Sequence, residues 1–400
     1  MTTLGAISYD EAIHFHNDTD EANDSGISSI SKEMLAKTRF PQWAPTWDIA
    51  HDHTFENVPT FKAIDRGLFA DPSYPLLKSI PGASFKHVSP KLGLEVNGIQ
   101  LSSLSNNQKD ELAHLVETYG VVAFRDQDLK YHSFDEIKKL GSYFGPLHVH
   151  PTSGAPLNHP EFHITYRRGS KDEQIKMFND KLHNIGWHSD VTYENQPPGI
   201  TFFAMLQSGE SGGDTQFIDM FETYDRLSPL MKSLIDNLKV LHTSKDQAYF
   251  AKLTGGIERK DPSDNIHPLV RYHPVLKKKC LFINKSFSRR ILGLKTEESD
   301  NLLLFLLNHT EACLDAHVRM QWDENTVVVW DNRRVIHTAT NDWDTEDIRH
   351  AFRVTSLAER PVANKDELDA WTPELELELE KSKDLVIKLS PKEYYEKYYQ

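Results

Sequence analysis

The short string Trp187-His188-Ser189-Asp190 places an imidazole and a carboxylate two residues apart. On an extended segment, side chains two residues apart point to the same side, so both can reach one metal ion. A face of two histidines and one carboxylate leaves three neighbouring positions open on iron(II), which a chelating cosubstrate and dioxygen can fill. In a chain with 20 histidines this pair alone is weak evidence, and the site needs a second histidine.

The second histidine is predicted to be His337, because it follows VVVWDN, a run typical of a buried strand that can return beside the first segment. Arg349 and Arg353 come 12 and 16 residues later. If AFRVTSL is a strand, positions 349, 351 and 353 share one face, and both guanidinium groups point into the same pocket. The planar fork of arginine suits carboxylate and sulfonate groups. The alternative is a pair of surface arginines.

The elements that must position these residues are a mixture of strands and helices. Helical periodicity and capping residues predict helices at 105–119, at 133–144, from Ser228 onward, and from about 297 to 317. The helix after Ser228 is expected to bury Leu230, Met231, Leu234, Ile235 and Leu238. Strands are predicted at VVAFRD, FHITYRR and GITFFAML, in a hairpin at RYHPVLKKKCLFIN, and as two strands in TVVVWDNRRVIHTA. Without a βαβ alternation, this order favours a barrel or sandwich with helices packed outside.

Composition limits the partners. The formal net charge of −14 argues against binding to nucleic acid or to an anionic membrane. The first 26 residues lack a basic start followed by an apolar stretch, and the longest apolar run, 302–307, is too short to span a bilayer. The two cysteines, Cys280 and Cys313, lie among apolar residues, which fits a reduced compartment. We therefore expect a cytoplasmic protein.

The chain divides into three predicted parts. Residues 1–80 are an N-terminal extension, partly extended or mobile, to which no catalytic role is given. Residues 81–361 form the catalytic domain. Residues 362–400 are a charged C-terminal extension, in which acidic and apolar residues alternate. This last part either supports self-association into a homo-oligomer or is a solvated, partly ordered tail.

A set of longer motifs, running in order from about Lys86 to Pro361, carries a resemblance. The motifs are FGPLHVHP, WHSDVTYENQPP, SGGDT, HPLVRYHP, LFINKSF, VVVWDNRRVIHTA and RHAFR. Together they resemble the taurine dioxygenase family, and within it the fungal sulfonate dioxygenases most. The resemblance implies a mainly β fold of the α+β kind, with a double-stranded β-helix (jelly-roll, cupin-like) core and flanking helices. It also implies Fe(2+), the cosubstrate 2-oxoglutarate and dioxygen.

The resemblance also implies a role for individual residues. His188, Asp190 and His337 match the iron ligands. Thr215 and Arg349 match the pair that holds the distal carboxylate of 2-oxoglutarate. Further residues match the substrate side of the pocket, namely Arg353 (shared with the cosubstrate), His150, Asn184, Val191 and Tyr193. Trp322 and Trp330 match tryptophans near the metal, and both can equally be core residues.

The implied reaction is hydroxylation of the carbon next to sulfur in an alkylsulfonate, which releases sulfite and an aldehyde together with succinate and carbon dioxide. Bacterial taurine enzymes carry a tyrosine where this chain has Ser153, so the resemblance does not extend to taurine itself. The alternatives within the family are an alkyl sulfate or an aryloxyalkanoate dioxygenase. The alternatives from other classes are a zinc hydrolase, since zinc also binds histidine and aspartate, and a noncatalytic metal-binding scaffold.

Overall fold

A large, mostly antiparallel sheet runs through the middle of the molecule. The computed structural model describes residues 26–400 except 52, 169–185, 254–255 and 344. The strand order is β3-β4-β5-β15-β7-β17-β6, in which only β4 and β5 are parallel neighbours. The bounds are Ser84–His87 (β3), Leu94–Asn97 (β4), Val121–Phe124 (β5), Val327–Asp331 (β15), Pro198–Gln207 (β7), Ile348–Leu357 (β17) and Phe162–Arg168 (β6).

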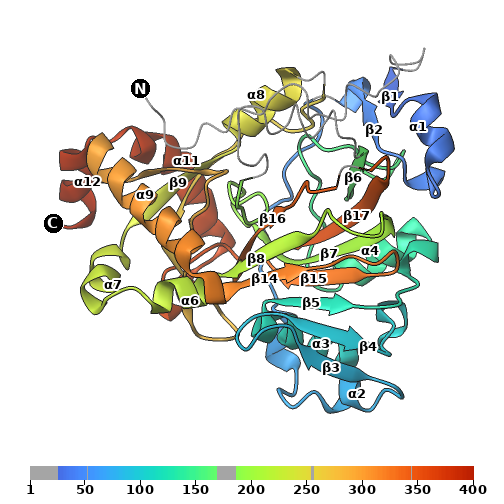
Figure 1. The fold of residues 1–400 in the computed structure, drawn as a ribbon. Helices are drawn as coiled ribbons and strands as arrows, with labels where there is room; N and C mark the ends of the chain where they lie inside the picture. The colour runs from blue at the N-terminus through green and yellow to red at the C-terminus, as the bar shows by residue number, and fades with distance from the viewer. Residues whose placement is uncertain (1–25, 52, 169–185, 254–255, 344) are drawn as a thin grey trace.

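A smaller antiparallel sheet packs against the large one. Its order is β14-β8-β16, with bounds His317–Met320, Thr215–Asp219 and Val335–Ala339. β15 and β16 follow one another in the chain but lie in different sheets, so the turn between them carries the chain across (Figure 1). Phe203, Trp330 and Ala351 of the large sheet meet Phe217 and Val318 of the small one in a single core cluster. This is the jelly-roll architecture expected from the motifs.

Helices cover the outer face of the large sheet. Along β15, Val328 and Trp330 face the small sheet, whereas Val327 and Val329 face the helices. This alternation explains why every residue of β15 is buried. The covering helices are α3 (Asn106–Tyr119) and α4 (Phe134–Ser142). The first is capped by Ser105 and the second by Ser133, both with a complete capping box, close to the predicted starts.

A second group of helices covers the small sheet. Ile218 and Ile336 face away from the large sheet and pack against α6 (Met220–Asp225) and α9 (Thr296–Ala312). The other elements on this side are α7 (Pro229–Ile235), β9 (Lys239–Thr243), α8 (Lys245–Leu253), β10 (Asp264–Pro268), β11 (Val270–Tyr272), β12 (Lys279–Leu281) and β13 (Ser288–Ile291). β11 and β12 form the predicted hairpin. The stripe predicted for α7 is wrong in part, because Leu230 and Leu234 are 82% and 57% exposed.

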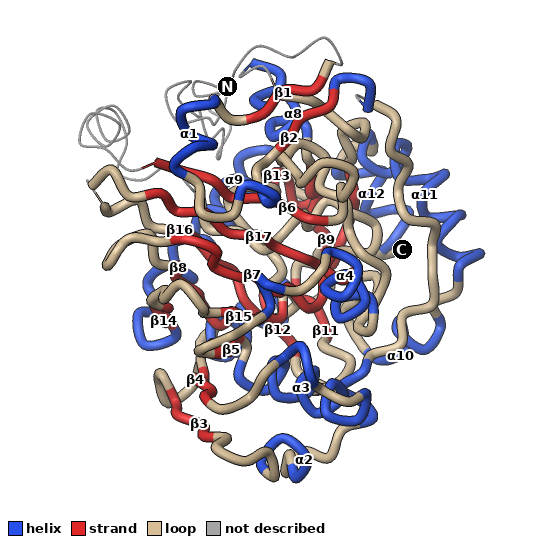
Figure 2. The backbone as a smooth tube through the Cα atoms, turned by 90° about the vertical axis from the view of Figure 1, so that its right-hand side faces the viewer, coloured by secondary structure: helices blue, strands red, loops and turns tan. Residues whose placement is uncertain are grey.

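The segment that follows residue 25 and the C-terminal segment both pack onto this framework, as Figures 1 and 2 show. The N-terminal elements are β1 (Ile27–Ser29), α1 (Lys32–Lys37), the 3-10 turn Pro41–Trp43, β2 (Thr46–Asp48) and α2 (Pro75–Lys78). They bury Met34, Trp43 and Leu77. The C-terminal segment is helical, with α10 (Lys365–Ala370), α11 (Pro373–Lys388) and α12 (Pro391–Tyr398). Val386 and Tyr394 of this segment pack against Leu292. Among the described helices, none is long and apolar enough to cross a membrane.

Candidate metal centre and its cavity

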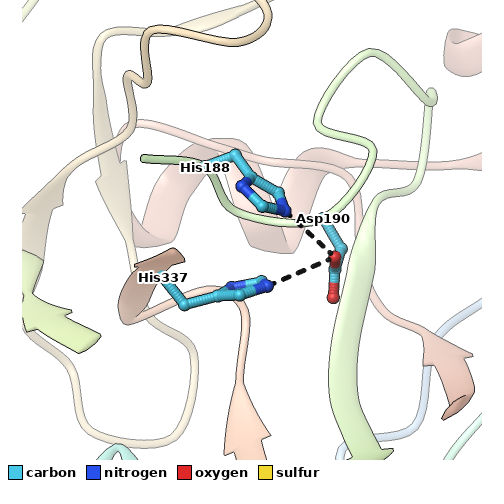
Figure 3. Close-up of side chains that lie close together, drawn as sticks. All are labelled: His188, Asp190 and His337. Carbon is cyan, nitrogen blue, oxygen red and sulfur yellow. Dashed lines mark ion pairs between the residues drawn. The ribbon is translucent and has the colours of Figure 1, made fainter. Parts of the chain in front are cut away.

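Two histidines from distant parts of the chain lie side by side. His337 is the central residue of β16, and the backbone of His188 pairs with it as an isolated antiparallel bridge. The His188 N–H donates to the His337 carbonyl at 3.0 Å, and the His337 N–H donates back at 2.7 Å. The ring centroids are 4.3 Å apart. Figure 3 shows both rings directed toward Asp190.

Asp190 brings its carboxylate to the two rings. Its Oδ1 lies 3.9 Å from His188 Nε2 and 3.8 Å from His337 Nε2. Its Oδ2 is buried and has no hydrogen-bond partner among the described residues. One potential ligand atom from each of the three residues lies within 4.8 Å of the others. Within the described part of the chain, no other group of histidine, cysteine and acidic side chains has this geometry.

The ionisation of these residues fits a metal ion, which binds neutral imidazole and ionised carboxylate. Burial lowers the pKa of His337 to about 3, and the nearby His188 acts in the same direction. Burial also lowers the pKa of His188. Burial alone would raise the pKa of Asp190, but Arg353 and the two histidines outweigh it, so the net shift is downward. A two-histidine, one-carboxylate face of this kind suits iron(II).

Asn332 fixes the segment that carries Asp190. The Ser189 hydroxyl donates to the Asn332 carbonyl at 2.6 Å, and the Asp190 N–H donates to Asn332 Oδ1 at 3.2 Å. Val191 follows with a φ of +39°, which is uncommon for a β-branched residue and marks strained backbone beside the ligand. Sequence reasoning missed Asn332, although it lies within the VVVWDNRRVIHTA motif.

The three ligands open onto a cavity of about 290 Å³. Most residues expected at the site line it, namely His150, Val191, Thr215, Trp330, Arg349 and Arg353. Tyr193 is not among the lining residues: it packs edge-on against Phe287, and its hydroxyl donates to Gln247 at 2.6 Å. Trp322 also lies behind the wall. Asn184 falls outside the described residues.

Arg349 is buried without a carboxylate partner among the described residues. Its Nε donates to the Gly213 carbonyl at 2.8 Å, and its guanidinium lies over the rings of Phe203 and Trp322, at 5.4 and 5.8 Å. Burial lowers the pKa of Arg349 to about 9, and Arg167 adds to this shift. A side-chain carbon on Gly213 would lie 2.7 Å from Arg349 Cδ, so this position requires glycine. The guanidinium can therefore receive an anion from outside the chain.

Thr215 and Arg353 line the same cavity as Arg349. Thr215 is the first residue of β8, and its hydroxyl accepts a hydrogen bond from Trp322 Nε1 at 3.3 Å. Arg353 shares the interior face of β17 with Arg349, as the predicted alternation requires. Its Nη1 donates to Asp190 Oδ1 at 2.5 Å and its Nη2 to His163 Nδ1 at 3.0 Å. His163 was missed, although FHITYRR alternates and sets His163 on the same face as Arg167.

The N-terminal extension reaches the cavity, which the sequence did not indicate. Pro45 and Trp47 are among its lining residues. Thr46 between them pairs with Ala155 through N–H to carbonyl bonds of 2.8 and 3.2 Å. A side-chain carbon on Gly154 would lie 2.6 Å from Pro45 Cβ, so only glycine allows this close approach.

Residues 84–355 match the model of the "Taurine catabolism dioxygenase TauD, TfdA family". The chain belongs to this family. It is 46% identical to the "Alpha-ketoglutarate-dependent sulfonate dioxygenase" of Saccharomyces cerevisiae, over 87% of this chain and 85% of the relative. It is 29% identical to the "Alkylsulfatase" of Acinetobacter baylyi, over 68% of this chain and 84% of that protein. A solved structure of a putative alpha-ketoglutarate-dependent taurine dioxygenase from Burkholderia xenovorans is similar, with a TM-score of 0.58 at 27% identity, covering 70% of this chain and 91% of the other.

Family membership settles the class of chemistry. The chain is a non-haem iron(II), 2-oxoglutarate-dependent dioxygenase, and it uses dioxygen as oxidant. The fold agrees with this, since its neighbours among solved structures include dioxygenases of the same family. The zinc hydrolase and the noncatalytic scaffold are therefore set aside in favour of the oxidoreductase.

Proposed function

We propose that this dioxygenase hydroxylates the carbon next to sulfur in an alkylsulfonate. One oxygen atom of dioxygen enters the substrate and the other enters succinate, while 2-oxoglutarate loses carbon dioxide. The resulting 1-hydroxysulfonate breaks its carbon–sulfur bond and yields an aldehyde and sulfite. The observation that carries this proposal is the pair Arg349 and Arg353, two buried guanidinium groups on one face of β17 that line one cavity and can receive two different anions.

The cosubstrate side of the cavity is assigned to Arg349 and Thr215. Arg349 has no carboxylate partner among the described residues, so the distal carboxylate of 2-oxoglutarate supplies the missing anion, and the Thr215 hydroxyl adds a hydrogen bond. His188, Asp190 and His337 would hold iron(II), which would supply open coordination positions for the chelating cosubstrate and for dioxygen. Asp190 and His337 are buried and His188 is half-buried, so the triad has limited contact with bulk water.

The substrate side is assigned to Arg353 and His150. Arg353 lies next to the metal ligand Asp190, so an anion bound there holds its neighbouring carbon close to the metal. Asn184 and Val191 are further substrate contacts in this assignment, and Tyr193 supports Val191 from behind. Phe250 and Phe287 supply apolar wall, which suits an organic tail on the anion.

The names of the relatives support a sulfonate over other anions. Two relatives above 35% identity are named as sulfonate dioxygenases, the second a putative one from Schizosaccharomyces pombe that is 37% identical over 81% of this chain. Relatives below 30% identity include an alkylsulfatase and a sulfate ester dioxygenase. An alkyl sulfate is therefore the second candidate, and an aryloxyalkanoate the third. These three substrates release different products, which are sulfite, sulfate and a phenol.

The setting of the reaction follows from charge and composition. We place the enzyme in the cytoplasm, with a small anionic organosulfur compound as its partner and no nucleic acid or membrane partner. The catalytic domain is assigned to residues 81–361, which contain the matched range 84–355. Self-association of the enzyme remains a hypothesis that its mass in solution will decide.

The deciding experiment is anaerobic reconstitution with iron(II) and 2-oxoglutarate, followed by oxygen and a panel of sulfonates and sulfates. Sulfite released in equal amount to succinate supports the proposal. Sulfate or a phenol in its place identifies one of the alternatives. His188→Ala, Asp190→Ala and His337→Ala serve as controls, and each should abolish substrate-dependent succinate formation. Near-normal turnover in any of them would overturn the ligand assignment.

A further inference from the structure

Four polar side chains form a continuous series beside the metal centre. His163 on β6 lies directly opposite Arg353 on β17 in the strand register. Arg353 Nη2 lies 3.0 Å from His163 Nδ1, and His163 Nε2 lies 3.5 Å from Ser153 Oγ. Ser153 Oγ lies 2.9 Å from His150 Nδ1. All four residues line the same cavity.

The direction of each hydrogen bond follows from which groups can only donate. A guanidinium has no acceptor, so His163 Nδ1 accepts from Arg353 and the proton of the neutral ring is on Nε2. Backbone N–H groups also only donate, and those of Thr152 and Ser153 point at His150 Nδ1, at 3.3 and 3.1 Å. The proton of a neutral His150 ring is therefore on Nε2 as well.

Both rings are neutral in these surroundings. Burial lowers the pKa of His150 well below its ordinary value, and the neighbouring His163 and Arg353 act in the same direction. Burial likewise lowers the pKa of His163, together with the charges of Arg353 and Arg259. The two ring planes are nearly perpendicular, at 84°, with centroids 4.7 Å apart.

Ser153 joins the two rings, with a short contact to His150 and a long one to His163. Its hydroxyl has one proton, which goes to His150 Nδ1, the shorter contact, and its oxygen accepts from His163 Nε2. All hydrogen bonds of the series thus run in one direction: Arg353 donates to His163, His163 donates to Ser153, and Ser153 donates to His150. Among the described residues, no acceptor takes the Nε2–H of His150, which is left for a ligand in the cavity. Arg259 braces this loop by donating to the carbonyls of His150 and Ser153.

We propose that His163 and Ser153 are positioning residues for substrate recognition: His163 orients Arg353, and the Ser153 hydroxyl holds the ring of His150, which the backbone N–H groups of Thr152 and Ser153 keep as an Nε2–H donor. The substrate's anionic head is then met by one charged group and one neutral donor of known direction. This inference rests on the proposed function in that it takes the head group to be the anion bound at Arg353. It assigns to Ser153 a hydrogen bond to His150 and no direct contact with substrate.

The kinetic test compares His163→Leu, Ser153→Ala and the double variant in the iron-loaded, full-length enzyme. Each single variant should raise the substrate KM by about three- to tenfold, the range expected for one net hydrogen bond. kcat and the KM for 2-oxoglutarate should change by less than about twofold, since His163 and Ser153 contact neither Arg349 nor the metal ligands. Because both changes break the same series of hydrogen bonds, the substrate KM of the double variant should be no higher than that of the more impaired single variant.

Rescue and control variants separate positioning from packing. His163→Gln keeps an acceptor for Arg353 and a donor for Ser153, so it should recover most of the substrate affinity lost in His163→Leu. His159→Leu changes a histidine that packs on Phe134 outside the cavity, and it should leave all kinetic constants unchanged. Additive losses in the double variant, an equal rise in the KM for 2-oxoglutarate, or no rescue by glutamine would each overturn the proposal.

A second measurement does not depend on turnover. Full-length protein with ¹⁵N-labelled histidine and zinc in place of iron reports the tautomer of each ring through its nitrogen shifts, and His150→Gln identifies the His150 signals. We expect unprotonated Nδ1 and protonated Nε2 on His150 in the wild type, and the same tautomer in Ser153→Ala, because the backbone N–H groups of residues 152 and 153 still point at Nδ1. The Nε2 signal of His163, identified with His163→Gln, should instead shift in Ser153→Ala, because it loses its acceptor. An Nδ1–H tautomer in the wild type would refute the inference even if sulfonate turnover is observed. The expected tautomer without sulfonate turnover would instead refute the proposed function.

Discussion

Arg333 and Arg349 stand on either side of His337 in the chain, and both are buried, at 4% and 6% exposure. Arg333 is surrounded by four carboxylates, those of Asp65, Glu117, Asp331 and Glu359. Arg349 has the Gly213 carbonyl and two aromatic faces, and no carboxylate among the described residues. An arginine surrounded by the protein's own carboxylates ties segments together, whereas one without them keeps its capacity to bind a ligand.

The pKa values of the two arginines are shifted in opposite directions. Burial alone would lower the pKa of Arg333, but Asp331, Asp65 and the other carboxylates outweigh it and shift the pKa upward. For Arg349, burial lowers the pKa to about 9, and the positive charge of the nearby Arg167 acts in the same direction. A buried cation is stabilised only when anions compensate its desolvation. The charge of Asp214 offsets only part of the desolvation of Arg349, and binding of a dicarboxylate would relieve the rest.

The two arginines also join different parts of the molecule. Asp65 comes from the N-terminal extension, Glu117 from α3, Asp331 from the end of β15 and Glu359 from the segment after β17. Arg333 thus links the extension to α3 and to the ends of two strands of the large sheet. Arg349 connects only the interior of β17 with the Gly213 turn before β8. The first arrangement cross-links the fold, and the second shapes one end of the cavity.

The largest effect is expected for Arg333→Met. Removal of this cation leaves four carboxylates, three of them buried, without their common partner, which should lower the free energy of unfolding by about 3–5 kcal/mol. Chemical and thermal unfolding followed by circular dichroism will measure the loss. Arg226→Met is the matched control, because Arg226 pairs with the exposed Asp315 at the surface and its loss should cost less than about 1 kcal/mol. Equal losses of stability in the two variants would show that Arg333 stabilises the fold no more than a surface arginine does.

A smaller and different effect is expected for Arg349→Met. The change should weaken 2-oxoglutarate binding by about ten- to a hundredfold, the equivalent of a charged hydrogen bond worth about 1.5–3 kcal/mol. Stability should stay the same or rise, since an incompletely compensated buried charge is removed. Titration of 2-oxoglutarate into the anaerobic iron(II) enzyme, alongside unfolding, measures both quantities. Destabilisation on the scale of Arg333→Met, with unchanged cosubstrate affinity, would reverse the roles of the two arginines.

Glu117→Gln tests how fully the carboxylates around Arg333 are ionised. Burial, with the charge of Asp65 adding to it, raises the pKa of Glu117 well above its ordinary value of 4.5. Between 4.5 and the raised pKa, the folded state keeps a proton that the unfolded state has released, so stability falls as the pH rises. Glutamine copies the protonated acid, so the variant should differ by about 1 kcal/mol or less in mild acid. It should then gain on the wild type as the pH is raised. Parallel stability curves for the two proteins would show that Glu117 is ionised.

The sequence allowed His188 and Asp190 to be predicted as one half of a metal site because their geometry follows from local rules, whereas the choice of His337 also relied on the strand before it and on the family resemblance. His188 and Asp190 are two residues apart, and the alternation of β17 sets Arg349 and Arg353 on one face, as the structure confirms. Capping residues likewise placed the starts of α3 and α4 to within one residue. These features depend on neighbours within a few positions, which a sequence displays directly.

What could not be predicted depends on contacts between distant residues. Arg333 meets Asp65 across 268 positions, so nothing near either residue distinguishes Arg333 from Arg349. His163 gains its role from the strand register with Arg353, and Trp47 reaches the cavity through an extension to which no role was given. The predicted burial of Leu230 and Leu234 failed for the same reason. Helical periodicity identifies a face of α7, but only the packing decides whether that face is covered.

The smallest effect is expected for Trp322→Phe, which tests whether aromatic faces stand in for carboxylates around Arg349. Phenylalanine keeps an apolar ring but removes the Nε1–H that Thr215 accepts, and it offers the guanidinium a weaker face. The half-saturating concentration of 2-oxoglutarate should rise about two- to fivefold, corresponding to about 0.5–1 kcal/mol. Substrate KM and iron affinity should not change.

Trp330→Phe is the matched variant: Trp330 donates to Asn332 and packs against His337, so its loss should weaken iron binding and leave 2-oxoglutarate binding largely intact. If both tryptophan variants instead weakened iron binding and cosubstrate binding to the same extent, the aromatic rings around Arg349 would support the cavity as a whole. The lack of a carboxylate beside Arg349 would then no longer indicate a separate anion site.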